Sequence, residues 1–175
     1  MFIDINYNKR PQEARLHLAK PNKQIIDIIH EKMGGSVSIK LGKINELTFS
    51  IPHQIEDDEL GEITPNKHTS LIKEKMLVRL TLGVYKEWYT IDSIEEDDND
   101  HNIFTVKAFS LGYELRGKKS PLFSDEDVYN ATQSLEKALS STVWSIGEVD
   151  ALFNNMFRSL SISTDTNVLD LVTQI

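Results

Sequence analysis

The chain contains no cysteine among its 175 residues. This absence excludes disulfide bonds, thiol nucleophiles and thiolate metal sites together. An excess of basic residues is also missing, because 19 Lys and Arg stand against 27 Asp and Glu and give a net charge of −8. An averaged negative surface repels phosphate groups, so we expect no specific binding to nucleic acid or to an anionic membrane.

Long apolar segments are missing as well. The first residues, Met1-Phe2-Ile3-Asp4-Ile5-Asn6, have neither the basic flank nor the apolar length of a signal peptide, and no run is long enough for a membrane span. The remaining composition is that of a folded protein, with 39% hydrophobic and 26% charged residues. The length suits one domain, or one domain and part of a second, so we expect a soluble protein with a packed core.

Up to about residue 120, apolar residues recur with period two between groups of turn residues, which indicates antiparallel β structure. Residues 42–45 are a plausible hairpin connection, and Gly83 joins two further strands. Residues 25–29 suit a helix by count, but their four isoleucines favour a strand, and Gly34-Gly35 is expected to end the segment in either case. The other predicted strands are 37–41, 47–51, 76–82, 84–94 and 103–109, the last following an acidic hairpin tip at 95–100.

After Pro121 the pattern changes. Ser124-Asp125-Glu126-Asp127 resembles a capping box, which predicts that a helix begins there. The residues of its apolar stripe are Val128, Ala131, Leu135, Ala138 and Leu139, and Ser140 and Ser141 are expected to close it. Further on, residues 143–146 predict a short strand, 157–162 another apolar segment, and 167–171 the beginning of a helix.

These patterns predict a mainly β fold with a smaller α+β part. We expect an antiparallel β-barrel-like or sandwich domain at residues 1–120 and a partial second α+β domain at 121–175. Because an apolar pattern still runs at Ile175, we expect the chain to be a fragment whose second domain is truncated.

Three partial motifs each lack an essential residue. Residues 112–119 approach a phosphate-binding loop, but Lys119 replaces the magnesium-binding hydroxyl. His30-Glu31 begins a zinc-protease pattern whose second histidine is replaced by Gly34. Asp98, Asp100 and Asn102 begin a calcium loop, but neither the required glycine nor the final glutamate follows.

No catalytic, cofactor-binding or metal-binding residues are therefore predicted. The histidines are not at ligand spacing, and each is expected to be a surface or partly buried residue: His17, His30, His53, His68 and His101. Trp88 and Trp144 are expected mainly to pack in the core, with an interface role for one of them as the alternative. The acidic run 56–59 is expected to be a solvated loop.

Several strings together resemble the amino-terminal part of the prophage tail-tip proteins, the tail-associated hub family of long-tailed bacteriophages. The strings are residues 16–21, 42–52, 88–95, 106–115, 144–147 and 158–162. The resemblance implies a fold similar to the contractile-tail baseplate hub, in which β-barrel-like domains assemble as a trimeric ring that closes the tail tube. It also implies contacts with the distal tail protein and the tape-measure protein, in a virion tail assembled in the bacterial cytoplasm.

The resemblance predicts a structural, non-enzymatic component of the tail tip that carries host-interaction modules further along the chain. Some family members have a peptidoglycan-cleaving module, which has no counterpart here. A cell-wall hydrolase with its carboxylates among the many acidic residues is one alternative, and a carbohydrate-binding module that uses Trp88 or Trp144 is another. A further hypothesis is a negatively charged channel lined by Asp57, Asp58, Asp97 and Asp98, which would repel passing DNA.

Overall fold

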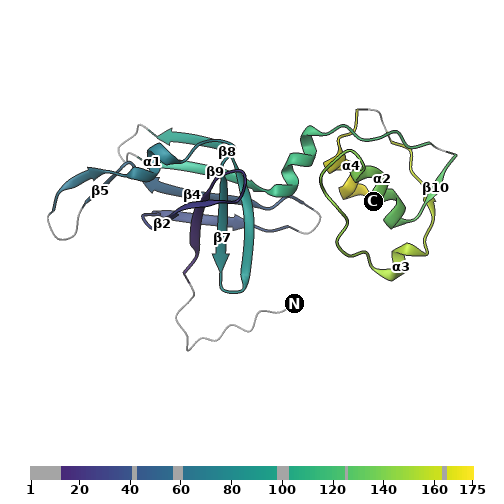
Figure 1. The fold of residues 1–175 in the computed structure, drawn as a ribbon, viewed down its shortest axis with the longest axis horizontal. Coiled ribbons are helices and arrows are strands. Elements are labelled where there is room, and N and C mark those ends of the chain that lie inside the picture. The colour runs from purple at the N-terminus through teal and green to yellow at the C-terminus, as the bar shows by residue number, and fades with distance from the viewer. Residues whose placement is uncertain (1–12, 41–42, 57–60, 98–102, 125, 163–164) are drawn as a thin grey trace. The chain divides into compact units, whose positions relative to one another are not determined.

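The computed structural model describes residues 13–40, 43–56, 61–97, 103–124, 126–162 and 165–175 (Figure 1). The chain divides into two compact units. The first contains Met1–Ile39 and Asn45–Leu111, and the second contains Lys40–Ile44 and Gly112–Ile175. The predicted division into domains near residue 120 stays a prediction.

The first unit is built on a seven-stranded sheet in the order β2-β1-β7-β8-β9-β4-β3. Every pair of neighbouring strands in it is antiparallel. Its strands are β1 (Arg15–Ala19), β2 (Ile25–Ile29), β3 (Gly34–Ser38), β4 (Glu46–Pro52), β7 (Leu77–Leu82), β8 (Tyr85–Asp97) and β9 (Ile103–Ser110). A hairpin of β5 (Gln54–Glu56) and β6 (Ile63–Pro65) precedes the short helix α1 (Lys67–Leu71). The structure confirms the mainly β class, whereas the expected barrel-like closure stays a prediction.

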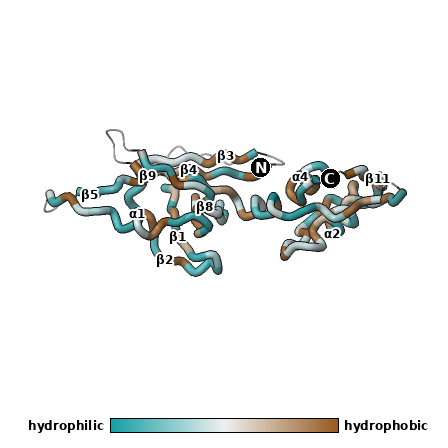
Figure 2. The backbone as a smooth tube through the Cα atoms, turned by 90° about the horizontal axis from the view of Figure 1, so that it is seen from above, coloured by the Kyte–Doolittle hydropathy of each residue, from teal (hydrophilic) through white to brown (hydrophobic). Residues whose placement is uncertain are grey.

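The core of this unit follows from the period-two pattern. Leu47, Phe49 and Ile51 of β4 are buried, and the residues between them are partly exposed. On β9 the buried residues are Phe104, Val106 and Ala108, with Val106 directly opposite Phe49. Each large apolar side chain buried in this way contributes about 1.5–3 kcal/mol. In Figure 2, brown hydrophobic stretches and teal hydrophilic stretches succeed each other along the strands.

Most strand predictions in this unit are confirmed. The segments 47–51, 76–82, 84–94 and 103–109 correspond to β4, β7, β8 and β9, and the isoleucine-rich segment is strand β2. The β7–β8 hairpin turns at Gly83, whose φ of 61° is readily adopted by glycine. The acidic tip is only partly described, because β8 ends at Asp97 and residues 98–102 lie outside the described residues.

The strand predicted at 37–41 is wrong in its limits. The observed β3 runs from Gly34 to Ser38, and Ile39 lies beyond it with 60% of its surface exposed. The two glycines that were expected to end the preceding strand instead begin this one. Gly35 lies so near β4 that a Cβ atom placed on it would be 3.2 Å from the carbonyl oxygen of Thr48. This close packing explains why glycine occupies a strand position here.

The second unit contains a few short elements. The predicted cap at Ser124 is wrong, because the helix begins after Asn130. The Asn130 side chain accepts a hydrogen bond from the N–H of Gln133, and the Gln133 side chain accepts one from the N–H of Asn130, which together form a capping box. The Ser124 hydroxyl oxygen instead accepts a hydrogen bond from the N–H of Glu126 within a turn, and Val128 belongs to a strand. The elements are η1, a 3-10 helix (Leu111–Gly117), β10 (Val128–Tyr129), α2 (Ala131–Leu139), α3 (Ala151–Asn154), β11 (Arg158–Ser159) and α4 (Val168–Gln174).

A small core holds the second unit together. Phe123, Ala138 and Leu171 are buried, and Tyr129 packs against them. Lys137 lies over both rings, with its Nζ atom 4.7 Å from the centroids of Phe123 and Tyr129. The helix expected at 167–171 is confirmed as α4, and α2 ends before Ser140 as expected. The strand expected at 143–146 is wrong, because this segment has no strand structure and Val143 is 95% exposed.

Candidate functional site

His68 is a fully buried polar residue of the first unit, with no exposed surface. The sequence positions it through the cap of α1, where the side chain of Asn66 accepts from the N–H of His68 at 3.0 Å. The same Asn66 donates its Nδ2 proton to the carbonyl of Pro52 at 2.9 Å, which anchors the helix to the end of β4. His68 was expected at the surface or partly buried, and this expectation is wrong.

Two carboxylates flank the imidazole of His68. Glu31 Oε2 lies 2.9 Å from Nδ1, and Asp27 Oδ2 lies 3.4 Å from Nε2. Neither contact has the angles of a good hydrogen bond, so each is an electrostatic contact that operates when the ring carries its second proton. Lys67 Nζ lies 2.6 Å from the same Asp27 oxygen, and this hydrogen bond keeps the pKa of Asp27 below its ordinary value. The cluster therefore ties α1 to β2 and to the loop after it.

This cluster is not a metal site. The two carboxylates approach opposite nitrogens of one ring and do not converge on a common point. Within the part of the chain that the structure describes, no group of three or more His, Cys, Asp or Glu side chains could hold a metal ion. His30 is exposed, so the partial zinc motif does not form a ligand pair either.

A second polar cluster lies on β8, where Glu87 stands between two tyrosines at inward-facing positions. Tyr89 donates its hydroxyl proton to Glu87 at 2.8 Å, and Tyr85 donates to the same carboxylate oxygen. The amide of Asn45 completes the shell at 3.1 Å. Burial and the neighbouring carboxylate raise the pKa of both tyrosine hydroxyls, that of Tyr89 well beyond its ordinary range. The cluster is therefore a satisfied, partly buried network, which rigidifies the sheet.

These carboxyl groups are poorly suited to acid catalysis. A general acid at neutral pH requires a raised pKa. The hydrogen bond from Lys67 lowers the pKa of Asp27. Outside the two clusters, the hydrogen bond from Lys32 also lowers the pKa of Glu13, so both groups remain anionic at neutral pH. The Glu87 carboxylate already accepts several hydrogen bonds.

The two tryptophans have polar partners. Trp88 is half-buried, and the guanidinium of Arg79 lies 5.5 Å from its ring centroid, which is a cation–π distance. In the second unit, Trp144 donates its indole N–H to Glu114. These two residues line a cavity of about 500 Å³ with Lys118 and the segment 140–143. Trp144 therefore packs at the rim of a polar hollow and is not a core residue.

The free edges of the large sheet are the feature that suits assembly. Within the described residues, β2 and β3 each pair on one side only. Beside β3 lies an apolar cavity of about 380 Å³, lined by residues of β1, β3, β4 and β7. Strands β1 and β7 thus face the same cavity as β3 and β4, although β8 and β9 lie between the two pairs in the strand order, which requires a strongly curved sheet. An unpaired edge beside an apolar hollow is a surface on which another strand can add.

The other residues singled out in the sequence are scattered. His17 is half-buried, and burial lowers the pKa of its ring. The rings of His53 and Phe104 form a T-shaped contact, with their centroids 5.8 Å apart. The segment 112–119 lies mostly in η1, and Lys119 forms a β-bridge with Asn167 in place of a phosphate cradle. The remaining candidates, His101, Asp98, Asp100 and Asn102, lie outside the described residues.

The polar residues around His68 and Glu87 were not found from the sequence. Asn66 three residues before Thr69 is a usable cap signal for α1, and the inward position of Glu87 follows from the period of β8. The partners Asp27 and Glu31 are far from His68 in sequence, so only the fold brings them together.

Among the described helices, none has the length and apolar character needed to cross a bilayer.

Comparisons with known proteins agree with this architecture. A curated relative is the SPbeta prophage-derived uncharacterized protein YomG of Bacillus subtilis strain 168, which is 28% identical over 156 residues. That match covers 89% of this chain but only 17% of YomG, so the chain spans less than a fifth of its relative.

Two solved structures have a similar fold. The prophage tail protein gp18 of Listeria monocytogenes EGD-e superposes with a TM-score of 0.59 at 10% identity, covering 91% of this chain and 44% of that protein. The tail protein of Neisseria meningitidis MC58 has a TM-score of 0.53 at 8% identity, covering 91% and 43%. At these identities the likeness concerns the fold.

The sequence match that defines the family falls on the first unit. It extends over residues 18–108, which is just over half of the chain and includes strands β2 to β8 entire, the last two residues of β1 and most of β9. The family is described as the YOMG N-terminal domain. This chain belongs to that family.

Proposed function

We propose that this chain is a structural component of a bacteriophage tail, located at the tail tip as part of a baseplate-like hub. The observation that carries the proposal is the fold, which is similar to those of two tail proteins over 91% of the chain. The prophage origin of YomG supports it, since a prophage carries the genes for virion components. The protein then acts by assembly in the virion tail, after synthesis in the bacterial cytoplasm.

The geometry of the sheet supports an assembly role. The edges β2 and β3 remain available for pairing within the described residues, and closed rotational symmetry lets one such surface serve every subunit contact. We infer a homotrimeric ring in the full-length protein, with the distal tail protein and the tape-measure protein as its neighbours. Light scattering of the full-length protein tests this: the expected mass is three times that of one chain, and a monomer at micromolar concentration contradicts it.

A non-enzymatic role fits the polar clusters. The carboxyl pKa values that are clearly shifted among the described residues are lowered, and the partly buried carboxylate of Glu87 is satisfied by tyrosine donors. Incubation of the purified chain with labelled cell walls tests the hydrolase alternative. We expect no release of label, and steady release would overturn the structural role.

The carbohydrate-binding alternative has less support. Arg79 stacks against Trp88, and Glu114 accepts from the indole of Trp144, so both candidate platforms already have partners. The structural role and sugar binding can be distinguished by titrating the chain with cell-wall sugars and following its tryptophan fluorescence. The structural role predicts no saturable quenching. Quenching that is lost in Trp144→Ala or Trp88→Ala would favour sugar binding.

A negatively charged channel belongs to the same proposal. Asp97 ends β8, and Asp57, Asp58 and Asp98 lie outside the described residues. In the assembled ring these four carboxylates would face passing DNA and repel it. Replacing all four with Asn should increase the retention of double-stranded DNA by the ring at low salt. A structure of the ring with all four on its outer surface would remove the basis for the channel.

A further inference from the structure

The outer face of the large sheet has a row of polar and aromatic residues across β1, β7 and β8. The core face of these strands is marked by buried residues such as Leu16 and Leu80, which lie opposite each other. Because successive side chains of a strand point to opposite faces, the residues between the buried ones point outward. The register places Arg79 of β7 between His17 of β1 and Trp88 of β8, so these three form one outer row.

A second outer row lies two residues further along the same strands. Thr81 of β7 is opposite Arg15 of β1 on one side and opposite Lys86 of β8 on the other. Arg15 and Lys86 are exposed, and Arg79 in the first row is partly buried. We call the six residues of the two rows the basic face, because they include three cationic side chains and no carboxylate.

The three cations of the basic face lack an anionic partner among the described residues. None of the ion pairs found there includes Arg15, Arg79 or Lys86. The guanidinium of Arg79 is held over Trp88, and its Nε atom is buried without a hydrogen-bond partner. The Nδ1 atom of the neighbouring His17 is also buried without one. Arg79 therefore has donor capacity that no described group uses, and a carboxylate is the acceptor that a guanidinium binds best.

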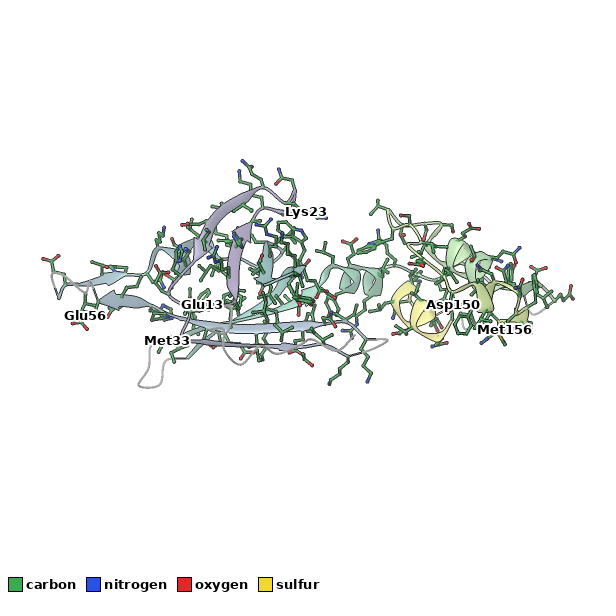
Figure 3. All side chains as sticks on the ribbon, turned by 90° about the horizontal axis from the view of Figure 1, so that it is seen from below. Glu13, Lys23, Met33, Glu56, Asp150 and Met156 are labelled. Atoms are coloured by element: carbon green, nitrogen blue, oxygen red, sulfur yellow. The ribbon has the colours of Figure 1, made fainter. Side chains whose placement is uncertain are left out.

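The surroundings of the basic face are also mainly basic. Glu13, which is labelled in Figure 3, comes just before β1, and its carboxylate already accepts a hydrogen bond from Lys32 at 3.0 Å. The charged groups that act on the ring of His17 are two arginines and His30. A chain with a net charge of −8 thus concentrates unpaired positive charge on one small part of its surface.

The dimensions of the basic face fit several carboxylates of one protein segment. With strands about 4.8 Å apart and same-face residues about 7 Å apart along a strand, the three cationic residues form a triangle with sides of about 8–10 Å. Acidic side chains on one face of an extended segment recur at a similar spacing, about 7 Å. Double-stranded DNA is a poorer fit, because it would extend past the basic face over a chain whose net charge is −8.

We propose that the basic face binds an acidic segment of a partner protein. Carboxylates of that segment pair with the three cations, and its backbone packs beside Trp88. Arg79 and Trp88 lie next to each other on this face, and arginine and tryptophan are the residue types that most often anchor protein interfaces. The inference names a binding surface that the proposed tail function does not specify, and it holds whether or not the chain is part of a tail.

Binding of a fluorescein-labelled peptide of ten glutamates to the whole chain tests the proposal, with fluorescence anisotropy at low salt as the signal. We expect saturable binding by the unaltered chain. The triple variant Arg15→Gln, Arg79→Gln, Lys86→Gln should bind about tenfold more weakly, because three ion pairs are lost. Since Arg79 is partly buried, the double variant Arg15→Gln, Lys86→Gln repeats the test at exposed positions only, and about fivefold weaker binding is expected.

A matched control separates the basic face from overall charge. The triple variant Lys40→Gln, Lys43→Gln, Lys118→Gln removes the same charge at exposed positions outside the basic face. It should bind the peptide with the affinity of the unaltered chain. Equal weakening in the two triple variants would overturn the proposal, as would the absence of saturable binding by the unaltered chain.

Trp88 reports where the peptide binds. The chain has two tryptophans, so in the Trp144→Phe protein only Trp88 contributes tryptophan fluorescence. Its emission should change over the same peptide concentrations as the anisotropy, and unchanged emission would overturn the proposal. Binding of a DNA duplex that is tighter than that of the peptide and is lost in the basic-face variant would assign the face to nucleic acid and overturn it. A dimer in light scattering that this variant separates would assign the face to a second copy, which overturns it as well.

Discussion

The Nδ1 atom of His68 lies 2.9 Å from Oε2 of Glu31, although the two residues are 37 positions apart in the chain. His68 is completely buried, whereas the Glu31 side chain is 27% exposed. The contact joins α1 to the loop after β2, and Asp27 on the other side of the ring reinforces it. A smaller side chain at position 68 would leave both carboxylates without this contact.

His68→Ala should therefore lower the free energy of unfolding of the chain by about 2–4 kcal/mol, through the loss of buried volume and of the contacts with Glu31 and Asp27. Urea denaturation at pH 6 measures this. The control is His30→Ala, the same change at an exposed histidine next to β2, which should alter stability by less than about 0.5 kcal/mol. Equal effects of the two replacements would show that the His68 cluster does not stabilise the fold.

Alkaline pH should destabilise the first unit through Tyr85 and Tyr89. Burial raises the pKa of both hydroxyls in the folded protein, so the folded state retains protons that the unfolded chain releases near pH 10. Stability is then constant below about pH 10 and falls as the pH rises further, by up to about 1.4 kcal/mol per pH unit for each tyrosine.

Denaturant titrations from pH 9 to 11.5 test this dependence, with tyrosinate absorbance as the signal of ionisation. Tyr89→Phe should have a shallower decline with pH than the unaltered chain, although its stability at pH 7 is lower because Glu87 loses a donor. An unchanged slope in the variant would contradict the assignment to Tyr89.

Removal of the Lys67 charge should change the titration of Asp27. The hydrogen bond from Lys67 is the largest cause of the lowered pKa of Asp27, so Lys67→Met should raise that pKa toward its ordinary value. Since folding lowers this pKa, the carboxylate stabilises the fold above the unfolded value of 3.8, and the contribution is lost as the pH falls through the lowered one.

Carboxyl chemical shifts followed by NMR between pH 2 and 6 measure the effect directly. The control is Lys73→Met, which removes the charge of another exposed lysine a few residues further along. The same upward shift in both variants would mean that overall charge, and not the Lys67 contact, sets the pKa of Asp27.

Local patterns predicted the sheet well but not its close contacts. The period-two runs of β4 and β9 have alternating burial, so their faces follow from residue order alone, whereas β8 contains a register shift between Ile91 and Ser93 that interrupts its alternation. The limits of β3 do not, because Gly35 is required by the approach of the Thr48 carbonyl, a contact set by strand pairing. The partners of His68 likewise depend on how β2 and α1 pack, which no local pattern encodes.

The cap of α2 shows how two similar local signals compete. Ser124 and Asn130 both precede a residue able to complete a capping box, and the structure uses Asn130. The decisive difference lies in tertiary contacts: Asn130 also donates to the carbonyl of Asn154 at 3.1 Å, which fixes the start of the helix against α3.

Asn130→Ala should therefore destabilise α2 by about 1 kcal/mol. The expected result is a roughly fivefold faster hydrogen exchange of the amides in 131–139. Ser124→Ala removes the cap expected from the sequence and should leave this exchange unchanged. The reverse order of effects would contradict the helix start at Asn130.

Neighbouring glycines in β3 should respond differently to alanine. A Cβ atom at Gly34 meets nothing within 4 Å, so Gly34→Ala should stabilise the chain by about 0.5 kcal/mol by restricting the unfolded state. A Cβ atom at Gly35 lies 3.2 Å from the Thr48 oxygen, so Gly35→Ala should be about 1 kcal/mol less stable than Gly34→Ala. Thermal unfolding of both proteins measures the difference, and equal stabilities would contradict the close approach of β3 to β4.

The central claim is that the protein is built into a phage tail. Immunogold labelling of purified phage particles from a strain that carries this gene, with antibodies against the chain, tests it most directly. The account predicts gold at the end of the tail opposite the head. Unlabelled particles, with the protein remaining free in the lysate, would contradict it.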